Sequence, residues 1–104
     1  MQHSTIDLVS VIESARQTQN WTVVVCPTQE VVHEARKVLA SALTQADRYS
    51  GRTAKLYEGG TVSVVHQNDE PFSEQFDIKF MGHWGPKTKK ERMGTWRQAA
   101  HKVL

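Results

Sequence analysis

A continuous apolar run at residues 21–26 constrains the fold of this chain more than any other feature. The run, WTVVVC, contains three consecutive valines, and β-branched residues in such a run favour a strand that is buried on both faces. Pro27 ends the strand, and Thr28 is a residue type that caps helices. From residue 29 to about residue 46, apolar residues return at helical spacing. A buried strand that leads directly into an amphipathic helix is half of a βαβ unit, so we expect an α/β fold.

The middle of the chain predicts a β-hairpin. Residues 52–58 and 61–67 are strand-like segments that flank Gly59 and Gly60, and two glycines between such segments indicate a tight turn with positive φ. The preceding segment, residues 46–51, reads ADRYSG and is interpreted as a loop.

Two further helices and one strand complete the predicted order. Residues 4–18 carry one apolar stripe at helical spacing, and residues 76–82 alternate apolar and polar side chains as a strand does. Residues 88–103 form a third predicted helix, which Gly94 weakens by roughly 1 kcal/mol relative to alanine. We expect one small α/β domain over residues 1–104, with a mixed sheet of about four strands flanked by three helices in the order α-β-α-β-β-β-α.

Positive charge is concentrated at the C-terminal end of the chain. The sequence has 13 Lys and Arg against 11 Asp and Glu, a net charge of +2. Residues 87–104 hold six of the basic residues and only one acidic residue, Glu91. Such a concentration is an electrostatic footprint for an anionic partner, although a solvated helix face has the same composition.

We expect a non-enzymatic module that binds DNA or RNA, or a protein of a nucleic-acid-processing complex, through this basic helix. Lys and Arg bind phosphates and release counterions, and a nearby Trp stacks on unpaired bases. The residues expected at this surface are Lys87, Lys89, Lys90, Arg92, Arg97, Lys102 and Trp84. Trp96 lies on the apolar stripe and is expected in the core. A helix that starts after a buried strand also attracts anions, so Thr28 and Gln29 are expected to form a secondary anion site.

The junction VVVCPTQ at residues 23–29 resembles a segment of the RecA-like cores of superfamily 2 helicases and terminase-type motors. In those proteins a strand that ends in Pro-Thr precedes a helix that contacts a nucleic-acid backbone. The resemblance continues through the hairpin at Gly60 to the strand at Asp77, over about half of the chain. The chain has no G-x-x-x-x-G-K-[S/T] sequence, so the resemblance implies a motor-like fold that lacks the P-loop. Ordinary helix capping gives the same strand–Pro–Thr–helix pattern.

Two other functions also fit the sequence. The chain is of a size suited to a protein–protein adaptor or inhibitor that docks on a larger nucleic-acid enzyme, as phage-encoded proteins often do. Alternatively, Glu58, Asp77 and Lys79 resemble the signature of the PD-(D/E)xK nucleases, which implies two carboxylates that hold a divalent metal beside a lysine. Alternation on a half-exposed strand explains Asp77 and Lys79 equally well.

We expect no metal site and no cofactor. The five histidines show no ligand spacing, and the one cysteine, Cys26, excludes a disulfide within the chain and suits a reducing cytosol. At the end of a buried strand, Cys26 is expected to pack as a small hydrophobe. No apolar run approaches the ~20 residues needed to span a bilayer, and residues 1–14 lack the pattern of a secretory signal. We therefore expect a cytoplasmic protein that does not contact a membrane.

Overall fold

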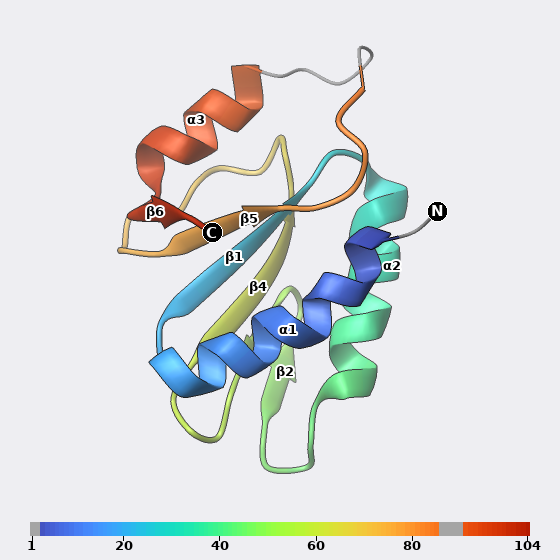
Figure 1. Cartoon of the computed structure of the whole chain (residues 1–104), viewed down its shortest axis with the longest axis vertical. Helices are drawn as coiled ribbons and strands as arrows, with labels where there is room; N and C mark the ends of the chain where they lie inside the picture. The colour runs from blue at the N-terminus through green and yellow to red at the C-terminus, as the bar shows by residue number, and fades with distance from the viewer. Residues whose placement is uncertain (1–2, 86–90) are drawn as a thin grey trace.

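The computed structural model describes residues 3–85 and 91–104, in which helices pack on both faces of one mixed β-sheet (Figure 1). The helices of these ranges are α1 (His3–Thr18), α2 (Gln29–Ala42) and α3 (Glu91–Ala99). The strands are β1 (Trp21–Cys26), β2 (Arg48–Ser50), β3 (Thr53–Lys55), β4 (Thr61–His66), β5 (Asp77–Phe80) and β6 (Lys102–Val103). The α/β class and the three helices are confirmed, but the prediction of four strands is wrong, because the described sheet has six.

The strand β1 lies in the interior of the sheet, whose strand order is β2-β3-β4-β1-β5-β6. β1 runs parallel to both β4 and β5, and β5 runs parallel to β6. The strands β2, β3 and β4 form an antiparallel meander on one side of it. Residues 22–26 of β1 are buried, as the continuous apolar run predicts for a strand covered on both faces. Within the described ranges, no helix has the length and apolar character needed to cross a membrane.

The two faces of the sheet are covered by different helices. Val24 and Cys26 belong to a core cluster with the buried residues of α1 and α2, whereas Val23 and Val25 pack with Trp96 of α3. Successive side chains of a strand point to opposite faces, so α1 and α2 cover the first face and α3 lies on the second. Figure 1 shows α1 crossing the sheet beside α2, with α3 at the other end of the molecule next to β6. α3 packs against β5.

The carboxylate of Asp47 joins three segments that are far apart in the sequence. Both terminal nitrogens of Arg16, on α1, donate to it at 3.0 and 2.8 Å. The backbone N–H groups of Thr44 and Tyr57 donate to the same carboxylate at 2.8 and 2.9 Å. The side chain of Asp47 has no exposed area, and its hydrogen bonds to Arg16 hold its pKa well below the usual range. Asp47 therefore ties the end of α1 to the α2–β2 loop and to the β3–β4 loop.

Three predicted boundaries are wrong. Residues 48–50 form β2 where a loop was expected, and all three of their side chains are exposed, so no apolar alternation marks them in the sequence. α2 ends at Ala42, before the predicted residue 46. The predicted C-terminal helix reaches only Ala99, because the backbone that follows pairs with β5 instead: His101 N–H donates to the Phe76 carbonyl and Leu104 N–H to the Ile78 carbonyl. The start of that predicted helix, residues 88–90, lies outside the described residues.

The two glycines of the hairpin serve different purposes. The hairpin is confirmed, but its strands are shorter than predicted, since β3 ends at Lys55 and Leu56 N–H donates to the Gly60 carbonyl at 2.8 Å. Gly59 has a φ of +121°, which glycine alone adopts without strain. A Cβ atom on Gly60 would lie 2.1 Å from the carbonyl oxygen of Ala15. Gly60 is therefore needed for the close approach of the loop to α1 and not for the turn itself.

We expect Asp47→Asn to reduce the free energy of unfolding by about 3 kcal/mol, because it leaves the Arg16 guanidinium without its buried carboxylate. Since the pKa of Asp47 is lowered on folding, its contribution is fully present above the unfolded-state pKa of about 4 and declines progressively as pH falls from that value through the lower folded-state pKa. Urea unfolding at pH 7 and at pH 3 should show a large difference between variant and wild type at pH 7 and a smaller one at pH 3. Glu58→Gln is the matched control, because Glu58 also pairs with Arg16 but is half exposed, so its loss should stay below about 1 kcal/mol. Equal losses in the two variants would contradict the prediction.

Gly60→Ala is expected to reduce stability by about 2–3 kcal/mol, because the new methyl group meets backbone atoms of Ala15. Gly94→Ala on α3 is the control: its added Cβ meets nothing within 4 Å, and the helix should gain about 1 kcal/mol. Thermal unfolding of the two variants measures the expected loss of stability in Gly60→Ala and the expected gain in Gly94→Ala. A Gly60→Ala protein as stable as wild type would show that the loop does not approach α1 this closely.

Candidate nucleic-acid interface

The predicted basic surface is only partly open to a ligand. Lys87, Lys89 and Lys90 lie outside the described residues. Arg92 is half buried, and its guanidinium donates to the carbonyls of Gln67 and Asp69 at 2.8 and 2.9 Å. Arg92 therefore holds the β4–β5 loop, and this use of its donors leaves it less available to a phosphate.

The two tryptophans of this region have structural contacts. Trp84 is half buried, its indole N–H donates to the Met81 carbonyl at 3.0 Å, and its ring meets that of Phe80 edge-on at 5.4 Å. Trp96 is fully buried and donates to the Gln67 carbonyl, so its prediction as a core residue is confirmed. Trp84 is therefore fixed against β5 and offers only part of its ring to a base.

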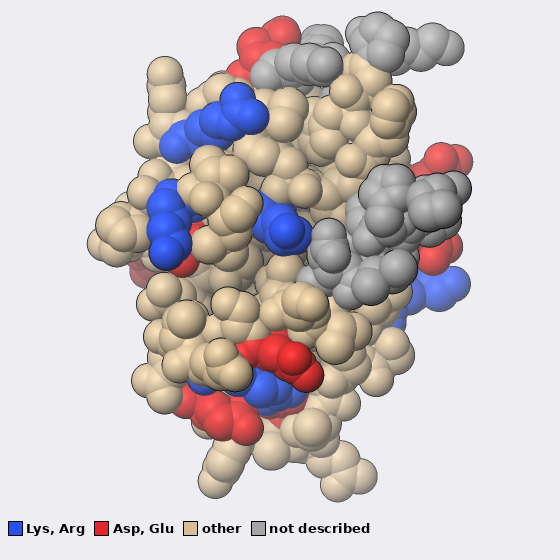
Figure 2. All heavy atoms as spheres, in the orientation of Figure 1, with Lys and Arg blue, Asp and Glu red and all other residues tan. Residues whose placement is uncertain are grey.

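Three cations at the β5–β6 side of the molecule form what we call the C-terminal cationic surface: Lys79, Arg97 and Lys102. Lys102 on β6 is in register with Asp77, two residues before Lys79, so Lys79 and Lys102 project from the same face of adjacent strands. Arg97 is exposed on α3, which packs on the opposite face of the sheet, and its guanidinium carbon lies 5.3 Å from the ring centre of Phe80. Figure 2 shows Lys and Arg side chains gathered over α3, β6 and the neighbouring strand, whereas basic and acidic side chains are mixed below them.

The three cations of this surface form no ion pair in the described part of the chain, although the buried Asp77 is the register partner of Lys102. The ion pairs of residues 3–85 and 91–104 join Arg16 to Asp47 and Glu58, and Arg52 to Asp69. Lys79, Arg97 and Lys102 take part in none of them. An anion that approaches this surface therefore displaces no bound carboxylate there.

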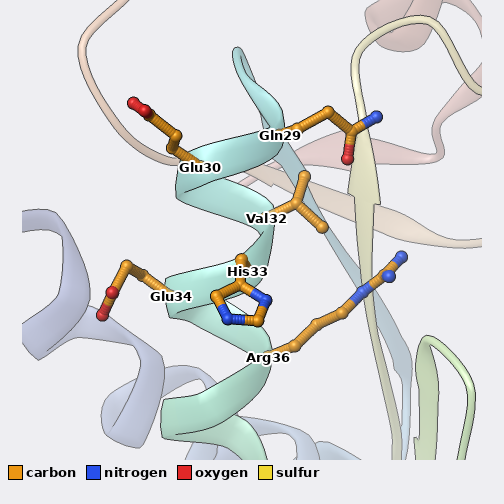
Figure 3. A pocket seen from close by; sticks show the side chains of 6 residues that line it. All are labelled: Gln29, Glu30, Val32, His33, Glu34 and Arg36. Atoms are coloured by element: carbon orange, nitrogen blue, oxygen red, sulfur yellow. The ribbon is translucent and has the colours of Figure 1, made fainter.

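The predicted secondary anion site gains no support from the geometry. Thr28 caps α2, and its hydroxyl accepts from the Val31 N–H at 3.2 Å. Gln29 lines a surface hollow along α2 together with Glu30, Val32, His33, Glu34 and Arg36 (Figure 3). In Figure 3, Glu30 and Glu34 project from one side of the helix, while Gln29 and Arg36 point to the other. Arg36 donates to the Val64 carbonyl at 3.0 and 3.3 Å, and the carboxylates beside Gln29 repel an anion.

Cys26 is enclosed by the core. Cys26 has no exposed area, and this burial raises the pKa of its thiol to about 12. The positive charge of Arg36 lowers the pKa, but its effect is smaller than that of burial. The thiolate needed for nucleophilic chemistry is therefore scarce near neutral pH, and a substrate has no path to the sulfur. The expectation that Cys26 packs as a small hydrophobe is confirmed.

The three residues of the nuclease signature are engaged separately. Glu58 pairs with Arg16 at 2.7 Å, and Asp77 is buried and accepts from the Asn20 amide at 3.4 Å. Lys79 lies beside α1 and Leu104. Among the described residues, no group of three or more His, Cys, Asp or Glu side chains is arranged to hold a metal ion. The geometry therefore adds nothing to the nuclease hypothesis.

The structure also assembles a groove that the sequence analysis did not predict. On the second face of the sheet, β3 and β4 extend past α3, and a hollow of about 450 Å³ lies over them. We call it the open sheet groove; it is lined by Trp21, Arg52, Thr53, Lys55, Thr61, Phe72 and Glu74. Phe72 comes from the β4–β5 loop, so the groove joins segments that no short motif connects. The alternation of Thr53 and Lys55 with buried Ala54 is the one sequence signal that marks an exposed strand face here.

Comparison with protein-family models, with curated proteins and with solved structures found no match for this chain. The resemblance to RecA-like motor cores therefore stays a prediction from the residues alone.

Proposed function

We propose that this chain is a non-enzymatic nucleic-acid-binding module whose contacts with the phosphate backbone are made by the C-terminal cationic surface and the basic segment 87–104. One observation carries the proposal: Lys79 and Lys102, on one face of β5 and β6, and Arg97, on α3 beside β5, have no ion-pair partners among the described residues. Residues 87–104, to which Arg97 and Lys102 belong, hold six basic residues and one acidic residue.

Several features support phosphate as the ligand. Lys and Arg on flexible stems contact successive phosphates and gain free energy from counterion release. The exposed Arg97 adds a planar donor group that binds a phosphate through two nitrogens. The candidate catalytic groups Glu58, Asp77 and Cys26 are held by other partners or buried, which favours binding over catalysis.

A protein–protein adaptor is the second candidate, and it differs from the first in its response to salt. Val103 and Leu104 are about half exposed beside the C-terminal cationic surface, so an apolar contact with a partner protein is available at the same edge. An interface built on such contacts changes little with ionic strength, whereas phosphate contacts weaken steeply.

We expect fluorescence-anisotropy titrations with labelled DNA and RNA to show binding that weakens with salt. The logarithm of the binding constant should fall by about 0.7–0.9 per phosphate contact for each tenfold rise in salt. The double variant Arg97→Gln/Lys102→Gln should lower this slope by about 2 and weaken binding to every sequence alike, because each side chain removes one phosphate contact.

Lys37→Gln is the matched control, because Lys37 is exposed on α2, which packs against α1, β4 and β1. It should leave the salt slope unchanged. Lys89→Gln/Lys90→Gln tests the adjoining basic segment in the same way. Absence of binding at low salt would overturn the proposal, and salt-insensitive capture of a protein partner would favour the adaptor.

A further inference from the structure

The open sheet groove has an aromatic wall built by residues from two segments. The rings of Trp21, on β1, and Phe72, in the β4–β5 loop, lie 4.5 Å apart between centres and are tilted by 46°. The guanidinium of Arg52 lies 4.9 Å from the centre of the Phe72 ring. Both rings are half buried, and both line the groove. The two rings, with the planar guanidinium stacked over Phe72, form a platform on which a flat ring packs favourably.

A hydrogen bond to the neighbouring strand β4 fixes the position of the Trp21 side chain. Its indole N–H donates to the Ser63 hydroxyl at 2.9 Å, and the hydroxyls of Ser63 and Thr53 are 2.8 Å apart. Thr61 and Thr53 also line the groove, and their hydroxyls act as donors or acceptors toward the polar edge of a ligand. The groove therefore combines a stacking surface with hydrogen-bonding groups, which an apolar docking site lacks.

The other wall of the groove is positively charged. Lys55 is exposed and lines the groove, and the exposed Arg48 is its register partner on β2 and points to the same face. Neither is part of an ion pair within the described residues. Arg52 pairs with Asp69 at 3.5 Å, and Glu74 is the one carboxylate among the lining residues described. The charge of the groove thus complements a polyanion.

We propose that the open sheet groove binds unpaired nucleotides of a single-stranded nucleic acid, with a base against Trp21 and Phe72 and a neighbouring phosphate on Lys55 and Arg48. This inference rests on the proposed nucleic-acid-binding function and adds selectivity for single strands to it. A duplex keeps the faces of its bases stacked inside the helix, so only an unpaired base reaches the two rings. The volume of about 450 Å³ is in the range of pockets that hold small organic ligands.

The test compares labelled single strands of about ten nucleotides, oligo-dT and oligo-rU, with a duplex of equal length. Phe72→Leu removes the stacking ring, and we expect it to weaken single-strand binding by about tenfold and to leave duplex binding unchanged. Lys55→Gln should weaken single-strand binding several-fold, and its exposed position on β3 keeps the fold intact. Tyr57→Leu and Lys37→Gln are the matched controls, an exposed aromatic residue and an exposed lysine that do not line the groove, and both should bind as wild type does.

Tryptophan fluorescence gives a direct readout of contact. Oligo-dT should quench the emission of the wild-type protein, and Trp21→Phe should remove this quenching, since Trp96 is fully buried and Trp84 lies against Phe80. Thermal unfolding of each variant verifies that it is folded.

The outcomes separate this inference from the proposed function. If Phe72→Leu and Lys55→Gln bind single strands as wild type does, while Arg97→Gln/Lys102→Gln weakens binding, the groove proposal is overturned and the backbone-binding proposal stands. If the groove variants weaken duplex and single strand equally, the single-strand proposal is also overturned. If the wild-type protein binds no nucleic acid at low salt, both proposals fall.

Discussion

The burial of β1 on both faces is the constraint on which the rest of this structure depends. Residues 22–26 are enclosed, and the strand runs parallel to both of its neighbours, so the chain must cross over the sheet to form each pair. α2 makes the first crossing, and α1 lies beside it on the same face. The opposite face of β1 is covered by α3 together with the aromatic residues of the β4–β5 loop. The layers on the two faces of the sheet thus keep water from residues 22–26 of β1.

The position of α3 determines which surfaces stay open. Its nine described residues pack on β5, and β3 and β4 extend beyond them on the second face. The side chains that this leaves uncovered are hydroxyls and cations around two rings, and not the apolar residues that a missing helix would need to bury. Of the C-terminal cationic surface, Arg97 lies on α3, whereas Lys79 and Lys102 project from the opposite face of the sheet at β5 and β6. The sheet itself therefore separates these two lysines from the open sheet groove.

The sequence predicted the elements whose residues carry a strong local pattern and missed those defined by distant pairing. β1 and α2 follow from a valine run and a clear helical period, whereas the exposed strand β2 and the two-residue β6 exist only through their backbone partners. Contacts between residues distant in the sequence also explain why the roles of Arg92 and Phe72 were not predicted. Arg92 looks like any surface cation in the sequence, but its donors meet the carbonyls of residues about 25 positions away. Phe72 lies in a polar loop, and nothing local shows that it reaches Trp21.

Arg92 also links the two proposed surfaces energetically. Together with Trp96 it holds the carbonyls at the start of the β4–β5 loop, and that loop carries Phe72 to the wall of the open sheet groove. A ligand that stabilises the docked position of α3 therefore also orders the ring on which a base would pack. If that coupling exists, thermodynamic reciprocity requires a base in the groove to strengthen binding at α3 by the same factor. If nucleic acid contacts both surfaces, as we propose, the loop of ten residues between β4 and β5 is the segment that would couple the two contacts.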